Sequence, residues 1–259
     1  NDFYVGMGNL TQGLVQELNN RFWKFNLGIG AWEEVSFPGG NHFRGFSSER
    51  YFGGGLSVSQ VNAANAALDF WKLENGSFVK LRSLPRVAYL SAAFETNDAV
   101  YVLGGGFGFE REILKYSKAS DTWSRIQDAP INITLHVMNF SYAGRQFFID
   151  QATKAVYAYD PGNESWSLET VFPGVLTNDR GFGVVIDGTA YVGMENRSEQ
   201  VWELNLQTLN WAAKNDFPGL TQARNVGVFN DSERIFILRN GEIQVAGAMQ
   251  MWVFDPKGY

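Results

Sequence analysis

Hydrophobic and polar positions alternate in short runs along the chain, and the same succession of runs recurs six times. Each repeat opens with an aromatic or β-branched run, such as residues 101–103, and a second run follows after a turn, such as residues 113–116. In five repeats a Trp or Phe and then a Pro come next. Alternation with a period of two predicts β-strands, and proline ends strand pairing because it has no N–H to donate. The pattern predicts short strands and no helix of convincing length.

The repeats begin near residues 3, 50, 100, 146, 190 and 234. A period of about 45–50 residues, with several short strands in each repeat, is typical of the blades of a β-propeller. We predict an all-β fold, a six-bladed β-propeller formed by a single domain over residues 1–259. In each blade the opening run is strand B, the second run is strand C and the Trp-containing run is strand D. The small apolar segment after the proline is strand A of the next blade.

The strand count predicts that the last blade is incomplete in this sequence. There are six candidates for each of strands B and C but five for each of strands A and D, because the sequence starts at a B strand and ends just after a C strand. An unpaired sheet edge exposes backbone N–H and C=O groups that other strands can bind. We expect a flanking segment or a partner to complete this blade.

The third repeat carries the fullest form of a recognisable motif. A glycine pair at residues 104–105 ends its B strand, an aromatic C strand follows, and Trp123 precedes Pro130. This motif resembles the Kelch repeat of the galactose-oxidase-like propellers, and the resemblance covers essentially the whole chain. The second repeat has Phe78 in place of the Trp, and the fourth and sixth repeats lack the glycine pair. Phe-Pro-Gly triplets similar to those of bacterial, Bacteroidota-type cell-envelope Kelch proteins begin at Phe37, Phe172 and Phe217.

The resemblance implies a fold more firmly than a function, because Kelch propellers serve as binding modules, scaffolds and enzymes. It implies first a non-catalytic protein-interaction or scaffold propeller of a bacterial cell-envelope assembly. Such a protein is secreted or held as a lipoprotein, in the periplasm or at the outer-membrane surface. The alternative is a carbohydrate-active or glycan-binding propeller similar to the sialic-acid mutarotases. A copper radical oxidase of this superfamily needs a Cys-linked Tyr, and the chain has no Cys.

The composition excludes several kinds of chemistry. A net charge of -6 disfavours a general nucleic-acid surface, because phosphate binding needs a basic field. Without Cys there are no disulfides, thiolate nucleophiles or Cys-ligated zinc, and only 2 His residues are present. We therefore expect no metal and no cofactor. No apolar stretch reaches the roughly 18 residues that a transmembrane helix needs, so we expect no membrane span.

Arginines are the candidates for ligand binding. Arg44, Arg180 and Arg224 each stand at the entry to an A strand, and Arg86 lies nearby in its own repeat. Since A strands line the central channel of a propeller, we expect these side chains to converge there. They would offer forked donors to the carboxylates of an acidic peptide or an anionic sugar. The alternative is that each arginine binds loop carbonyls within its own blade.

Titratable groups give weaker signals. His42 and His136 both begin A strands, which fits either a shared polar site in the channel or two structural groups. Acid–base chemistry on a sugar would need a pair of carboxylates, and no pair has diagnostic spacing. The candidates, which are more commonly solvated turn residues, are Asp150, Asp179, Asp187, Glu195 and Asp231.

The B–C connections differ in length from blade to blade. Residues 9–21, 56–68 and 240–250 are long and mostly uncharged, whereas residues 151–154 are short. Variable loops on a regular scaffold usually carry recognition, and uncharged content favours protein contact. The tryptophans recur with the blades and are expected in the core. Better candidates for partner binding are the non-repeating Phe107 and Phe109, with Gln12 and Gln60 of the long loops.

Overall fold

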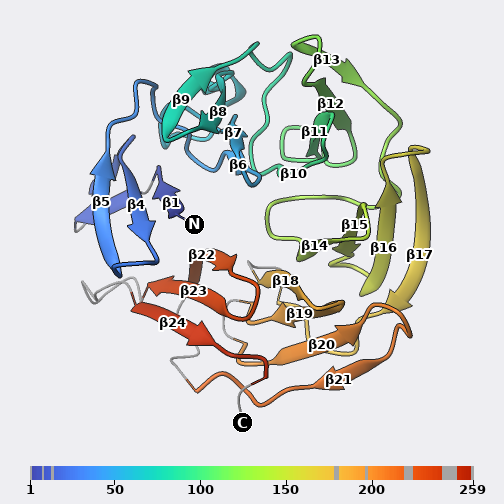
Figure 1. Cartoon of the computed structure of the whole chain (residues 1–259). Helices are drawn as coiled ribbons and strands as arrows, with labels where there is room; N and C mark the ends of the chain where they lie inside the picture. The colour runs from blue at the N-terminus through green and yellow to red at the C-terminus, as the bar shows by residue number, and fades with distance from the viewer. Residues whose placement is uncertain are drawn as a thin grey trace. The chain divides into compact units, whose positions relative to one another are not determined.

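The computed structural model describes residues 2–7, 9–12, 15–177, 181–195, 198–218, 224–240 and 250–257. The chain divides into two compact units, Asn1–Leu135 and His136–Tyr259, coloured blue to green and green to red in Figure 1. The described residues form strands β1 to β24 and one 3-10 turn, Ala63–Asn65. The fold is all-β, a six-bladed β-propeller with three blades in each unit, as the repeats predict. The prediction that residues 1–259 form one domain stays a prediction.

The first unit holds three antiparallel blades and a hairpin. The first blade pairs β1 (Asp2–Gly6), β4 (Phe22–Asn26) and β5 (Ala31–Val35) in that order, and the hairpin of β2 (Asn9–Gln12) and β3 (Val15–Leu18) lies in its B–C connection. The second blade pairs β6 (Phe46–Ser47), β7 (Tyr51–Gly53), β8 (Phe70–Glu74) and β9 (Ser77–Lys80). The third pairs β10 (Ala92–Glu95), β11 (Ala99–Leu103), β12 (Ile113–Ser117) and β13 (Thr122–Arg125).

The second unit holds the other three blades. The fourth blade pairs β14 (Asn139–Tyr142), β15 (Arg145–Ile149), β16 (Ala155–Asp160) and β17 (Ser165–Val171). The fifth pairs β18 (Phe182–Ile186), β19 (Thr189–Gly193), β20 (Val201–Asn205) and β21 (Trp211–Ala213). The sixth pairs β22 (Arg224–Asn230), β23 (Ile235–Asn240) and β24 (Gln250–Phe254).

The strand count agrees with the sequence prediction. Blades two to five have all four strands in the order A, B, C, D. Among the described residues the first blade has no A strand and the sixth has no D strand, so there are five of each and six of strands B and C. The strands also lie at their predicted places, since the opening run at residues 101–103 lies in β11 (Ala99–Leu103) and the second run at residues 113–116 lies in β12 (Ile113–Ser117).

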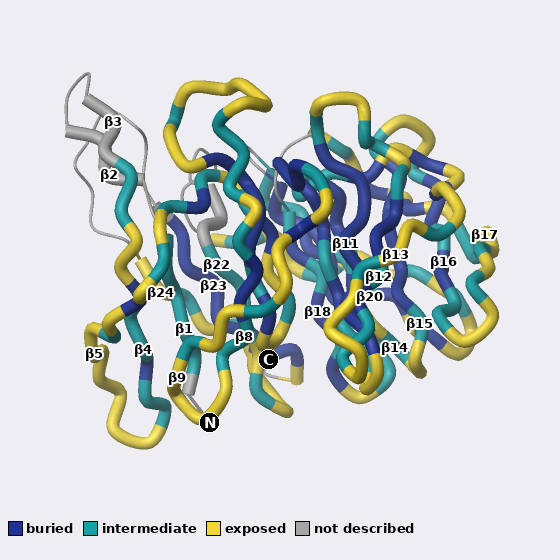
Figure 2. The backbone as a smooth tube through the Cα atoms, turned by 90° about the horizontal axis from the view of Figure 1, so that it is seen from above, coloured by how far each residue is buried: buried dark blue, intermediate teal, exposed yellow. Residues whose placement is uncertain are grey.

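Burial follows the position of a strand in its blade. All five positions of the B strand β11 are buried, whereas the D strand β13 has no buried position. Figure 2 shows this contrast, with dark-blue stretches along β11 and yellow loops at the strand ends. A strand buried on both faces reads as a continuous apolar run, which is what residues 99–103 are. Neighbouring blades share their cores, as Phe70 of the second blade packs in one cluster with Val100 and Leu114 of the third.

The Phe-Pro-Gly triplets close the gap between successive blades. The phenylalanine ring meets the tryptophan of the next C strand edge to face, with centroid distances of 5.0, 6.2 and 4.8 Å and interplanar angles of 71°, 76° and 73°. Edge-to-face contacts of this kind suit the charge distribution of aromatic rings. The three pairs are Phe37 with Trp71, Phe172 with Trp202 and Phe217 with Trp252. Trp71 is a core residue as expected, and Trp202 and Trp252 are partly buried against core clusters. The expectation is wrong for Trp32 of the first D strand, which is 43% exposed because no further strand of the described residues covers the outer edge of that blade.

Candidate functional site

Two crossover segments of the first unit run side by side, each leading from the D strand of one blade to the A strand of the next. The backbone N–H of Leu90, in the second segment, donates to the carbonyl of Arg44, in the first, at 2.9 Å. The B–C loop of the third blade is attached to the second segment, because the N–H of its Gly106 donates to the carbonyl of Tyr89 at 2.8 Å. Arg44 and Leu90 have φ angles of 55° and 60°. Side chains other than glycine rarely adopt this left-handed conformation, and such strained positions cluster at functional sites.

Three side chains meet where these segments approach the B–C loop of the third blade. Arg44 is exposed, and its Nη1 donates a hydrogen bond of 3.0 Å to the hydroxyl of Tyr89. The ring of Phe107 lies 5.4 Å from that of Tyr89, centroid to centroid. Tyr89 is buried beneath them, whereas Phe107 is 38% exposed and also left-handed, with a φ of 64°. We call Arg44, Tyr89 and Phe107 the crossover surface.

Glycines at the end of β11 hold the third B–C loop close to the crossover segments. Gly104 and Gly105 have φ angles of 63° and 112°, which favour glycine. A Cβ on Gly104 would lie 2.0 Å from the carbonyl oxygen of Ile133, and one on Gly105 would lie 2.5 Å from the hydroxyl of Ser91. The glycine pair that the sequence shows is thus a place of close backbone approach, and it fixes the base of the loop that presents Phe107.

Arg86 and Phe109 lie next to this surface, and Phe109 contacts the residue cluster of Tyr89. The guanidinium of Arg86 pairs with Glu112, donates to the carbonyl of Val87 at 2.7 Å and lies 4.4 Å from the ring centroid of Phe109. Burial lowers the pKa of Arg86, and the bond to Glu112 opposes that shift. Phe109 packs in the cluster that contains Tyr89. Arg86 therefore binds a loop carbonyl of its own blade, which is the alternative that the sequence left open for the arginines.

The two histidines lie in different environments. His42 is buried, and its Nδ1 donates to the carbonyl of Gly54 at 2.9 Å. Its ring packs near those of Phe37 and Phe52, with both centroid distances at 6.3 Å. Burial lowers the pKa of His42, which keeps the imidazole neutral. His136 is partly buried at the start of the second unit, and its carbonyl accepts a bond of 3.3 Å from Gln151.

Three other predicted site residues are described only in part or not at all. Arg180 lies outside the described residues. Arg224 begins β22 and Gln12 ends β2, and for both only the backbone is described. Gln60 is exposed in the B–C loop of the second blade, where its carbonyl accepts a bond of 3.1 Å from Asn65. Of the two predicted arginines whose side chains are described, Arg44 is exposed and Arg86 is mostly buried.

The candidate carboxylates are occupied by local contacts. Glu195 is 1% exposed and accepts bonds from the backbone and hydroxyl of Thr177 and from Gln151. Asp150 accepts a hydrogen bond of 2.5 Å from the hydroxyl of Thr153. Asp187 accepts one of 2.5 Å from Nζ of Lys257, and Asp231 accepts one of 2.7 Å from Nη2 of Arg234. Asp179 lies outside the described residues. Within the part of the chain that is described, no group of three His, Cys, Asp or Glu residues is placed to hold a metal ion.

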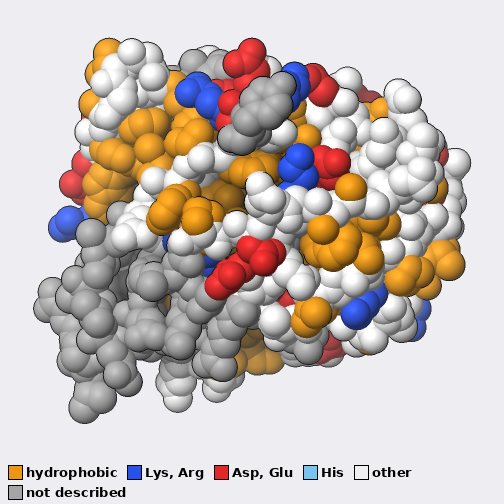
Figure 3. All heavy atoms as spheres, turned by 90° about the horizontal axis from the view of Figure 1, so that it is seen from below, with side chains coloured by type: hydrophobic (Ala, Val, Ile, Leu, Met, Phe, Trp, Pro, Cys, Tyr) orange, Lys and Arg blue, Asp and Glu red, His pale blue; other side chains and the backbone are white. Residues whose placement is uncertain are grey.

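Tyr89 is the member of the crossover surface that the sequence did not single out. The sequence could have indicated it, because an aromatic residue stands at the same position of two crossover segments, Phe43 before Arg44 and Tyr89 before Leu90. On the described part of the face in Figure 3, acidic and basic side chains are interspersed among apolar patches rather than gathered by sign.

Comparisons with known proteins leave the family open. No protein-family model matches the sequence, and no curated protein matches it either. Among the helices that the structure describes, none has the length and apolar character to cross a lipid bilayer.

Proposed function

We propose that this propeller is a non-catalytic interaction module that binds a protein partner through its crossover surface. The observation that carries the proposal is the arrangement of Phe107, which is 38% exposed, held in a left-handed conformation and packed against Tyr89 beside the exposed Arg44. Aromatic and arginine side chains dominate the binding energy of protein interfaces. The exposed part of the Phe107 ring is available to a partner.

The B–C loop of the second blade begins next to this surface and carries two further exposed apolar side chains. Leu56, at the base of the B–C loop of the second blade, packs in one cluster with Tyr89. Beyond it Val58 and Val61 are 44% and 56% exposed. An apolar patch with an arginine at its edge fits a partner that presents an apolar side chain next to a carboxylate, because the guanidinium can bind that carboxylate with two parallel hydrogen bonds.

The finer assignment rests on the sequence motifs. The glycine pair, the aromatic C strand and the Trp before Pro resemble the Kelch repeat, and the Phe-Pro-Gly triplets resemble bacterial cell-envelope proteins. These resemblances support a Kelch-type propeller that acts as a scaffold within a bacterial envelope assembly, in the periplasm or at the outer-membrane surface.

Quantitative affinity purification from the native envelope tests this proposal. The bait proteins are the wild type, a Phe107→Ala/Arg44→Gln variant and a Leu168→Ala control, which removes another exposed apolar side chain, 61% exposed on β17. We expect a stoichiometric partner with the wild type and the control, reduced at least tenfold with the double variant. Recovery of the propeller as a lone monomer, or equal recovery of the partner by all three, would contradict the proposal.

A carbohydrate-binding function is the second candidate, favoured by the same arginine. The guanidinium carbon of Arg44 lies 5.1 Å from the ring centroid of Phe43 and 6.0 Å from that of Tyr89, a setting suited to a sugar that carries a carboxylate. Titration calorimetry with sialic acid decides between the two. Heat that is lost in Arg44→Gln, and in Arg180→Ala or Arg224→Ala, would favour sugar binding, whereas no heat with the wild type would exclude it.

A further inference from the structure

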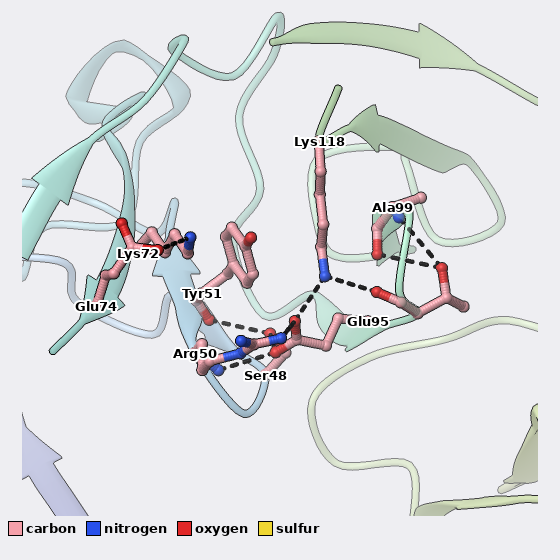
Figure 4. A network of polar contacts seen from close by, with 9 residues as sticks. Ser48, Arg50, Tyr51, Lys72, Glu74, Glu95, Ala99 and Lys118 are labelled. Atoms are coloured by element: carbon pink, nitrogen blue, oxygen red, sulfur yellow. Dashed lines mark hydrogen bonds and ion pairs between the residues drawn. The ribbon is translucent and has the colours of Figure 1, made fainter. Parts of the chain in front are cut away.

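A pocket of about 270 Å³ opens at the opposite strand ends of the second and third blades, by the A–B turns. Its polar lining consists of Arg50, Tyr51, Lys72, Asn97, Tyr116 and Lys118. Figure 4 shows four of these residues, Arg50, Tyr51, Lys72 and Lys118. The chain as a whole has 27 acidic and 21 basic residues. The pocket's three cations, Arg50, Lys72 and Lys118, pair with two carboxylates, Glu95 and Glu74, so the group keeps one positive charge in excess, opposite in sign to the net charge of the whole chain. We call this hollow the cation pocket.

A buried carboxylate behind the pocket positions two of its cations. Glu95 has a side chain that is 5% exposed, and its Oε2 lies 2.8 Å from Nζ of Lys118 and 3.4 Å from Nη2 of Arg50. Lys118 also donates to the carbonyl of Thr96 at 2.6 Å. The backbone N–H of Arg50 donates to Oε1 of Glu95 at 2.9 Å. Two of the three ammonium protons of Lys118 are thus used, and the third is left for a ligand.

Lys72 and Tyr51 complete the set of donors. The ammonium groups of Lys72 and Lys118 lie on opposite sides of the Tyr51 ring in Figure 4, and Nζ of Lys118 is 4.9 Å from the centroid of that ring. The ring stacks on Phe70 with a centroid distance of 5.7 Å, which holds it in place. Lys72 pairs with Glu74. Within the described part of the chain, the hydroxyl of Tyr51 and two protons of Lys72 have no hydrogen-bond partner.

We propose that the cation pocket binds a phosphate or sulfate group, either free or as the monoester of a small ligand. A guanidinium, two ammonium groups and a phenol line one hollow from two blades, and Asn97 also lines it. A tetrahedral oxyanion accepts hydrogen bonds in several directions at once, whereas a planar carboxylate accepts them mainly in one plane. The number and spread of the donors therefore fit phosphate or sulfate better than a carboxylate. This site is independent of partner binding at the crossover surface.

Titration calorimetry with the full chain tests the proposal at a constant ionic strength set with chloride, because salt screens exposed charges. The probes are inorganic phosphate, sulfate, glucose 6-phosphate and acetate. We expect saturable binding of one phosphate, sulfate or sugar phosphate per chain, and at least tenfold weaker binding of acetate. Lys72→Gln and Arg50→Gln should each weaken phosphate binding about tenfold. Lys214→Gln is the matched control, since Lys214 also pairs with a surface glutamate, Glu203, at 3.4 Å.

A further variant separates binding from a structural role of the ion pair. Glu74→Gln breaks the same pair as Lys72→Gln but removes the competing carboxylate, so it should strengthen phosphate binding or leave it unchanged. If the pair were only structural, both variants would weaken binding alike, and that result would overturn the proposal. No saturable heat with any phosphate or sulfate probe, an equal affinity for acetate, or an equal loss in Lys214→Gln would overturn it as well.

Discussion

The Nη1 of Arg44 donates a hydrogen bond of 3.0 Å to the hydroxyl of Tyr89, 45 residues further along the chain. This bond joins the crossover segments that lead into the second and third blades. It turns an exposed cation toward an aromatic ring that already supports Phe107, whose centroid is 5.4 Å away. The recognition surface that we propose is therefore organised before any partner arrives, which lowers the entropy that binding has to overcome.

Replacement of Tyr89 by Phe tests that organisation. The substitution removes the hydroxyl that accepts from Arg44 but keeps the ring beneath Phe107. Since a hydrogen bond contributes about 0.5–1.5 kcal/mol net, we expect the free energy of unfolding to fall by about 1 kcal/mol or less. Urea denaturation measures the change. A loss of several kcal/mol would mean that Tyr89 serves mainly the core rather than the surface.

The glycine of the first Phe-Pro-Gly triplet should not tolerate a methyl group. A Cβ on Gly39 would lie 2.4 Å from the ring of Phe37 and 2.9 Å from that of Trp71, and both rings are buried. Overpacking of this kind usually costs about 1–3 kcal/mol. Gly40, the next residue, has nothing within 4 Å of the same position. We expect Gly39→Ala to lower the urea midpoint clearly and Gly40→Ala to leave it nearly unchanged, and equal midpoints would refute the packing argument.

Removal of the phenylalanine ring of the second Phe-Pro-Gly triplet should lower the free energy of unfolding more than Gly39→Ala does. Phe172 is 1% exposed and lies against Trp202 and Trp211, with centroid distances of 6.2 and 5.3 Å. Truncation of a fully buried phenylalanine costs about 3–5 kcal/mol, because a cavity remains. We expect Phe172→Ala to destabilise by that amount and Phe107→Ala by much less, since Phe107 is 38% exposed. Chemical denaturation of the two variants compares them, and similar losses would show that Phe107 is a core residue.

The blades were predictable from the sequence because their signals are local and repeated. The B strand at residues 99–103 is apolar at every position since both of its faces are buried, and a proline follows each of the five described D strands within five residues. Phe107 and Phe109 stood out because they do not repeat, and the structure places both beside Tyr89. The sequence thus located the loop that presents the surface.

The cation pocket was beyond sequence analysis for a physical reason. Lys72 belongs to a C strand, Arg50 to an A–B turn and Lys118 follows a C strand of another blade, so no short motif links them. They meet only because the second and third blades pack together and Glu95 draws two of the side chains inward. Likewise, the spacing that grouped Arg86 with Arg44 did not reveal that Arg86 pairs with Glu112.

His42 should make the stability of the protein depend on pH. Its imidazole is buried, and burial lowers its pKa below the ordinary 6.5 despite the opposing bond to the carbonyl of Gly54. The charged groups that act on it, Asp69 and Lys80, form an ion pair of 2.8 Å and have opposite effects. Above pH 6.5 the imidazole is neutral in both the folded and the unfolded chain. Below that pH the unfolded chain binds a proton that the folded chain excludes, so the free energy of unfolding falls as the pH drops toward the folded-state pKa.

Urea denaturation at pH 7.5, 6.5 and 5.5, with the wild type and His42→Gln, isolates this contribution. The carboxylates and the other titratable groups are common to both proteins, so their effects cancel in the difference between the two free energies of unfolding. We expect that difference to begin to change near pH 6.5, where half of the unfolded chains carry the proton, and to shift further by pH 5.5, with the wild type losing more stability than the variant. Parallel pH profiles would show that the folded protein protonates His42 as readily as the unfolded chain does.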